Sequence, residues 1–116
     1  MPFTDLLDRW SSRPVIRGAA VVSEDGLLVH DALAGAVDRE AIAALAVTVR
    51  RHAEQLGAAA SAGDLGRVVV EFAGGPAILA ALDDRHTLVV LAAPDRDLGP
   101  LLFDIRDGRS ALRQAI

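Results

Sequence analysis

The sequence predicts an α/β fold, a three-layer α/β/α sandwich built on a five-stranded, mainly antiparallel sheet. Apolar segments of strand length form a group of two and a group of three, and short turns join the strands of each group. Amphipathic helical segments stand before, between and after these groups, giving the order α-β-β-α-β-β-β-α. Helices on both faces of one sheet produce three layers. The 116 residues contain no linker or internal repeat, so residues 1–116 are expected to form a single domain.

The first helix is expected over residues 3–10. Pro2 suits a helix start, and Pro14 prevents extension much beyond Ser12. Four apolar residues of the segment share one face: Phe3, Leu6, Leu7 and Trp10. Trp10 is interpreted as a packing anchor on that face.

The first two strands are expected at residues 15–23 and 27–30, joined by a turn with Asp-Gly hairpin chemistry. The first strand is apolar on both faces, which indicates that both are covered. Glu24 and Asp25 in the turn are compatible with an acid–base pair or with a solvated turn. The solvated turn is favoured, because nothing nearby in the sequence supplies a pocket.

The second group begins with an alternating strand at residues 67–73, in which Val69 and Glu71 face away from Val68, Val70 and Phe72. A strand with a charge on one face suits a sheet edge. The turn after it carries two glycines and precedes a fourth strand at 77–82. The fifth strand, at 87–93, is apolar on both faces and is expected to be central.

The last helix is expected to start near Pro100. Gly108 weakens its middle by about 1 kcal/mol relative to alanine, so a kink or break is expected there. Its apolar stripe consists of Leu98, Leu101, Leu102, Ile105, Leu112 and Ile116.

The long central helix, residues 38–56, organises the chain. Asp38 is the expected N-cap, and Gly57 is the expected C-terminal stop. One apolar stripe is predicted to pack on the sheet: Ile42, Leu45, Val49, Ala53 and Leu56. The opposite face carries Ala43, Val47, Arg50, Arg51 and Glu54. Its unusual apolar character predicts contact with another subunit. The alternative is an alanine-rich helix from an alanine-rich proteome.

Composition excludes several classes of protein. Hydrophobic residues make up 52% of the chain, which argues against disorder. The net charge of −4 disfavours nucleic acid as a partner. No apolar run approaches the roughly 20 residues of a membrane span, so no membrane insertion is expected. The first ten residues lack a signal-peptide pattern and cysteine is absent, so a cytoplasmic location is expected. All twelve basic residues are arginine, which points to a GC-rich bacterial genome.

Motifs that carry catalysis are not found in the sequence. A chain without lysine cannot hold the phosphate-binding Gly-x-x-x-x-Gly-Lys motif. His30, His52 and His86 are scattered, so no metal site is expected, and His52 is interpreted as a partly buried packing residue. Ser23 and Ser61 lack the Gly-x-Ser-x-Gly context. We therefore expect no catalytic residues and no cofactor, and predict that the protein is not an enzyme.

Five segments, in order and over nearly the whole chain, resemble the Roadblock (dynein light-chain) family and its bacterial MglB-like branch. They are GAAVVSEDGLLV at 18–29, REAIAALAVTVRRHAEQL at 39–56, RVVVEFAGGPAILAAL at 67–82, TLVVLAAP at 87–94 and LGPLLFDIR at 98–106. The resemblance implies a profilin-like layout and a homodimer or heterodimer. In the family, the third strands pair across a two-fold axis and the long helices pack together.

The resemblance also implies a partner. It favours a dimeric regulator of a bacterial Ras-like small GTPase, with a GTPase-activating or scaffolding role. The alternative is a pure assembly subunit of a signalling or motor complex without effect on nucleotide turnover, and a weaker third hypothesis is a small-molecule sensor. The residues predicted for the dimer or partner interface are Ala43, Val47, Arg50, Arg51, Glu54, Val69 and Glu71.

Overall fold

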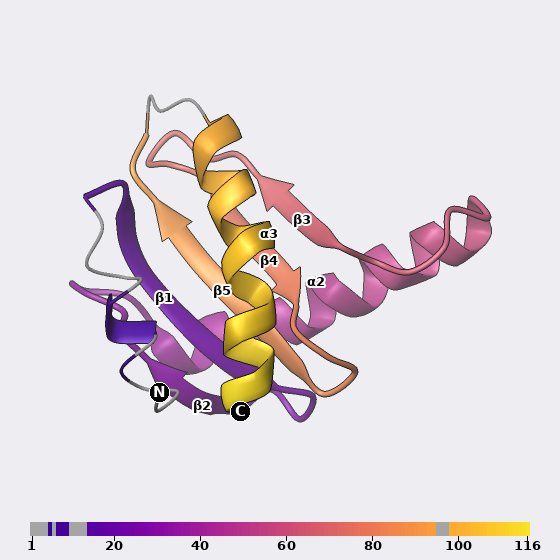
Figure 1. Cartoon of the computed structure of the whole chain (residues 1–116), viewed down its shortest axis with the longest axis horizontal. Coiled ribbons are helices and arrows are strands. Elements are labelled where there is room, and N and C mark those ends of the chain that lie inside the picture. Colours follow the sequence, from indigo (N-terminus) through magenta and orange to yellow (C-terminus); the bar gives the residue numbers. More distant parts are fainter. Residues whose placement is uncertain (1–4, 6, 10–13, 95–97) are drawn as a thin grey trace.

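The chain folds into one five-stranded sheet with a long helix on each face (Figure 1). The structure, a computed structural model, describes residues 5, 7–9, 14–94 and 98–116. The elements are β1 (Ile16–Ser23), β2 (Leu28–Asp31), α2 (Arg39–Ala59), β3 (Arg67–Val70), β4 (Ala77–Ala81), β5 (His86–Ala92) and α3 (Leu98–Ala115).

The strand order is β2-β1-β5-β4-β3, and every neighbouring pair is antiparallel. The prediction of β3 as an edge strand and of β5 as the central strand is confirmed, although β3 ends at Val70 and not at residue 73, and β2 forms the other edge. Helix α2 links the two edges, crossing behind the sheet, while α3 crosses in front of it (Figure 1). The predicted α/β/α sandwich is therefore confirmed.

Alternation along the strands divides the core into two clusters, one on each face of the sheet. The α3 side buries Val21, Ile78 and Val90 against Leu101 and Ile105. The α2 side buries the residues of opposite parity, which are Val22, Leu79 and Val89, against Ala43 and Ala46 of the helix. The sheet is thus buried on both faces, as the apolar character of β1 and β5 predicts.

The N-terminal segment lies on the α3 side. Asp5 and residues 7–9 are helical, and Leu7 is fully buried in the same cluster as Leu101, Ile105 and Leu112. Leu7 and α3 therefore share one face of the sheet. The predicted contacts of Phe3, Leu6 and Trp10 lie outside the described residues.

Two of the hairpin turns need glycine for different reasons. Gly26 closes the β1–β2 turn with a φ of 78°, and its N–H donates to the carbonyl of Ser23 over 3.0 Å. Gly75, between β3 and β4, has a φ of 118°, and a Cβ atom there would lie 2.1 Å from the carbonyl oxygen of Ala92. The second turn therefore depends on close approach of two backbones as well as on conformation.

Of the two predicted ends of α2, only the N-terminal one agrees with the structure. The Asp38 carboxylate accepts a hydrogen bond from the Ala41 N–H at 3.1 Å, which confirms the N-cap. The predicted stop at Gly57 is wrong, because α2 continues through it to Ala59 and the chain turns at Ser61, whose φ is 53°. The break predicted at Gly108 is also wrong, since α3 is continuous and its buried Ile105 and Leu112 hold both halves on the sheet.

Candidate interaction surface

Several residues of α2 face the opposite way from the sequence prediction, although Ile42 packs against the α2-side core and Arg51 and Glu54 are exposed, as expected. Ala43 is 1% exposed and Ala46 is 5% exposed against the sheet, whereas Leu45 is 61% exposed and Leu56 is 71% exposed. Small side chains let the helix axis lie close to the strands, so the larger residues point away. The prediction that Leu45 and Val49 pack on the sheet is therefore wrong, and so is the placement of Ala43 on an outer face.

The outward side chains of α2 form an apolar surface that continues onto the edge of the sheet. Leu45 and Val49 stand beside Val70 and the 62% exposed Phe72, which follows β3. Between them lies a groove of about 230 Å³ lined only by apolar residues: Ile42, Leu45, Ala46, Val49, Val70, Phe72, Ala77, Leu79, Val89 and Leu91. Contiguous exposed apolar surface of this kind marks an interaction site in a soluble domain. We call it the α2–β3 surface.

Strand β3 leaves one of its edges without a strand partner, because it ends the sheet and pairs only with β4. The strand is short and its exposed residues include Arg67 and Val69. An unpaired edge exposes backbone N–H and C=O groups that can bind another strand. The apolar groove and this edge are adjacent, so one partner can cover both.

Arg50 turns inward from α2 and fastens the helix to the β4–β5 turn. Its guanidinium donates to the carbonyls of Asp83 and His86, both at 2.8 Å, and to the hydroxyl of Thr87 at 3.0 Å. Glu54, one turn further along the helix, lies 3.7 Å from the Arg50 Nε atom. The side chain is only 11% exposed, so Arg50 is a structural clamp.

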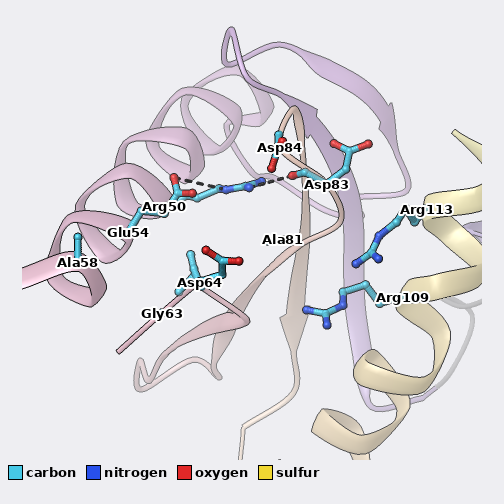
Figure 2. Close-up of a pocket in the computed structure, with 11 residues that line it drawn as sticks. Arg50, Glu54, Ala58, Gly63, Asp64, Ala81, Asp83, Asp84, Arg109 and Arg113 are labelled. Atoms are coloured by element: carbon cyan, nitrogen blue, oxygen red, sulfur yellow. Dashed lines mark hydrogen bonds and ion pairs between the residues drawn. The ribbon is translucent and has the colours of Figure 1, made fainter. Parts of the chain in front are cut away.

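A polar pocket of about 520 Å³ lies next to this clamp, between the ends of α2 and α3 (Figure 2). Arg109 and Arg113 enter it from α3, opposite Arg50 and Glu54 (Figure 2). Both α3 arginines donate to backbone carbonyls, Arg109 to Gly66 at 3.2 Å and Arg113 to Leu82. These bonds tie α3 to the residues that directly flank β3 and β4.

In the β4–β5 turn, the pKa of the Asp83 carboxyl lies below its ordinary value. Burial raises the pKa of the Asp83 carboxyl. The Arg85 N–H and the His86 side chain, whose Nδ1 is 2.9 Å away, lower this pKa by more than burial raises it. The net effect is a lowered pKa. Asp83 thus stays ionised and keeps the turn in the shape that presents its carbonyl to Arg50.

The seven residues predicted for an interface do not share one surface. Four are exposed, which are Arg51, Glu54, Val69 and Glu71. Ala43 and Arg50 face inward, and Val47 is half-buried against the α2-side core. The sequence prediction missed Leu45 and Phe72. The spacing of Ile42, Leu45 and Val49 indicates an apolar stripe but not whether it faces the sheet or solvent, and Phe72 lies on the same expected strand face as Val68 and Val70.

The histidines do not meet one another. The Nε2 atom of His30 lies 3.3 Å from an Asp8 carboxylate oxygen, and His86 contacts Asp83. His52 is exposed, with Nδ1 2.9 Å from the Thr48 carbonyl oxygen, so its interpretation as a packing residue is wrong. Across the described ranges, no three histidine, aspartate or glutamate side chains are grouped to hold a metal.

Neither helix among the described residues combines the length and the apolar character needed to cross a bilayer. The sequence model of the Roadblock/LC7 domain matches residues 2–92. The chain belongs to the Roadblock/LC7 family. Helix α3 lies beyond the matched residues.

Solved structures share the whole architecture. MglB of Myxococcus xanthus superposes with a TM-score of 0.88 at 18% identity, covering 97% of this chain and 92% of that one. A Roadblock/LC7 domain from Streptomyces avermitilis gives 0.86 at 22% identity, covering 98% and 97%. MglB of Thermus thermophilus gives 0.82 at 14% identity, covering 97% and 87%. At these identities the likeness concerns the fold alone. Among curated proteins, none matches the chain significantly.

Proposed function

We propose that this Roadblock-family chain is a non-enzymatic, dimeric regulator of a bacterial Ras-like small GTPase. The observation that carries the proposal is the α2–β3 surface, an apolar face next to an unpaired strand edge. Two copies related by a two-fold axis would cover both features at once, because an isologous contact uses the same surface twice. The dimer would then present both long helices as one platform.

The GTPase is supported by the family and by the resemblance to the MglB-like branch. On the platform, Arg51 and Glu54 are the exposed charged residues of α2 among those predicted for the interface. They line a polar hollow of about 340 Å³ with Glu24, Asp25 and Arg85. We propose this hollow as the polar part of the GTPase contact, with the exposed Arg51 rather than the largely buried Arg50, which also lines it, as the contacting arginine.

The dimer is tested by light scattering of Leu45→Glu at micromolar concentration. The wild type is expected to be a dimer and the variant a monomer, because the new carboxylate would be buried against an apolar surface. Val29→Glu is the matched control, since Val29 is 46% exposed on β2, at the edge of the sheet opposite β3. A wild-type monomer would contradict the proposal.

The GTPase is tested by a pull-down with a Ras-like GTPase encoded beside the gene, in its GTP and GDP states. Binding that prefers one nucleotide state, with or without faster hydrolysis, is the expected result. Arg51→Ala should weaken binding and leave the dimer intact, since the residue is exposed. Binding that ignores the nucleotide and leaves hydrolysis unchanged would favour the pure assembly subunit.

A further inference from the structure

We propose that two copies pair along β3 in the register centred on Val69, which places Glu71 of each copy in an arginine-lined pocket of the other. This inference rests on the dimer proposed above and specifies its register and its polar contact. Three independent observations lead to it: the direction of the β3 backbone groups, the order of side chains along the strand, and a pocket with three arginines.

The backbone groups available on the β3 edge belong to alternate residues. Ala81 donates to the Gly66 carbonyl at 3.1 Å, in the same register that pairs Arg67 with Ala80. Because bonded and non-bonded pairs alternate in an antiparallel ladder, Val68 and Val70 also bond β4. The N–H and C=O groups of Arg67 and Val69 therefore point outward, toward a second strand, and Glu71 follows directly after the end of β3.

The outward-pointing backbone groups of the two copies can bond one another only when the two-fold axis passes through a residue, which we call the centre of the register. A centre between two residues would set an outward-pointing residue opposite one that already bonds β4. Centring on Arg67 or on Glu71 brings like charges together, which is destabilising for directly opposed residues. Centring on Val68 or Val70 leaves a charge opposite Val69. Centring on Val69 places Arg67 opposite Glu71 of the second copy, twice.

The other face of the strand agrees with this register. Val68 belongs to the α2-side core, and Val70 lines the apolar groove on the same side. The Val69 centre sets Val68 opposite Val70 of the second copy, so apolar residues meet beside Leu45 and Val49. Charged residues then meet only on the α3 side, where Arg67 shares a face with the α3-side residue Ala80.

A pocket on the α3 side provides the place for the Glu71 carboxylate. It has a volume of about 180 Å³, and Arg67, Arg106 and Arg109 line it together with Gly66, Ala80 and Ile105. No carboxylate stands in its wall. Within the described residues, neither Arg67 nor Arg106 has an ion-pair partner. Small-molecule sites measure roughly 300–1,000 Å³, so this smaller space suits one acidic side chain.

Charge reversal tests the register. Arg67→Glu and Glu71→Arg should each weaken the dimer by at least about tenfold, because each opposes two like charges at both ends of the strand pair. An equimolar mixture of the two variants should recover a dimer containing one chain of each kind. In that heterodimer one contact is the wild-type contact and the other is its reversal. Analytical ultracentrifugation and native mass spectrometry measure affinity and composition.

Arg85→Glu is the matched control for Arg67→Glu, since it changes the charge equally on the exposed β4–β5 turn. Arg106→Ala tests the pocket, because it removes an arginine without touching the strand, and it should weaken the dimer several-fold. A wild-type dimer with no heterodimer preference overturns the register. An unaffected Arg106→Ala dimer overturns the pocket, whereas a wild-type monomer refutes the underlying dimer itself.

Cross-linking gives a second measurement that does not depend on charge. The chain has no cysteine, so Val69→Cys introduces a single thiol at the proposed axis. Bonded antiparallel pairs hold their Cα atoms about 5.5 Å apart, within disulfide range. Mild oxidation should link Val69→Cys to its copy and leave Val68→Cys unlinked. Preferential linkage at position 68 would overturn the Val69 centre.

Discussion

Arg50 shows how one side chain can join two layers of the molecule. It donates to the carbonyls of Asp83 and His86 and to the hydroxyl of Thr87 at the end of the sheet. Arg50→Ala should lower the free energy of unfolding by about 2–4 kcal/mol, because buried acceptors lose a charged donor. Urea denaturation measures this loss. Arg51→Ala, one residue away but exposed, should change stability by less than about 0.5 kcal/mol.

Asp83 should make part of the stability of this turn depend on pH. Its pKa is lowered in the folded chain from an ordinary value of 3.8. The carboxylate therefore stabilises the fold above that value, and its contribution disappears as the pH falls through the folded pKa. The stability difference between wild type and Asp83→Asn should shrink between pH 6 and pH 3. A constant difference would show that Asp83 acts without its charge.

Leu45 and Leu79 separate surface from core on the α2 side. Leu45→Ala should change unfolding of the monomer by less than about 0.5 kcal/mol. Leu79 is 6% exposed on the sheet beneath the helix, so Leu79→Ala should cost about 2–5 kcal/mol. Denaturation at several protein concentrations separates the free energy of unfolding of the monomer from the free energy of dimer dissociation. Equal losses of unfolding free energy in the two variants would show that Leu45 is a core residue.

The β3–β4 hairpin depends on one of its two glycines. Gly75→Ala places a Cβ atom against the Ala92 carbonyl and requires an unfavourable φ, so the melting temperature should fall by several degrees. At Gly74 the nearest atom to a new Cβ is the Arg17 Nη1, at 4.0 Å, so Gly74→Ala should be tolerated. Equal melting temperatures would mean that the two backbones separate easily.

Sheet elements were predictable because their signals are local. Runs of apolar residues and turn chemistry place β1, β4 and β5 within a residue or two of their observed ends. The face of α2 was not predictable from periodicity alone, since Ala43, Ala46 and Leu45 are all apolar. Which of them meets the sheet depends on how closely the helix approaches it. The bonds of Arg50 cross more than thirty residues of sequence and leave no local pattern.

At the scale of the whole molecule, dimer formation should be visible in hydrogen exchange resolved to single amides. The amides of Arg67 and Val69 point away from β4, and Glu71 follows directly after the strand, so the protection of these three amides should rise with protein concentration. Those of Val68 and Val70 bond β4 and should stay protected at every concentration. Exchange that is independent of concentration for all five amides would contradict pairing along β3.

The strand order has a further consequence for the time the chain needs to fold. The β1–β5 ladder joins Ile16 to Ala92 and Ser23 to His86 at the centre of the sheet, so it closes a loop of more than sixty residues. The hairpins β1–β2 and β3–β4, in contrast, close over a few residues. Long-range closure is the slow step in sheets of this kind. We therefore expect the two hairpins to form first and to dock late. The folding barrier then comes from the conformational entropy that α2 and its flanking loops lose when the loop closes.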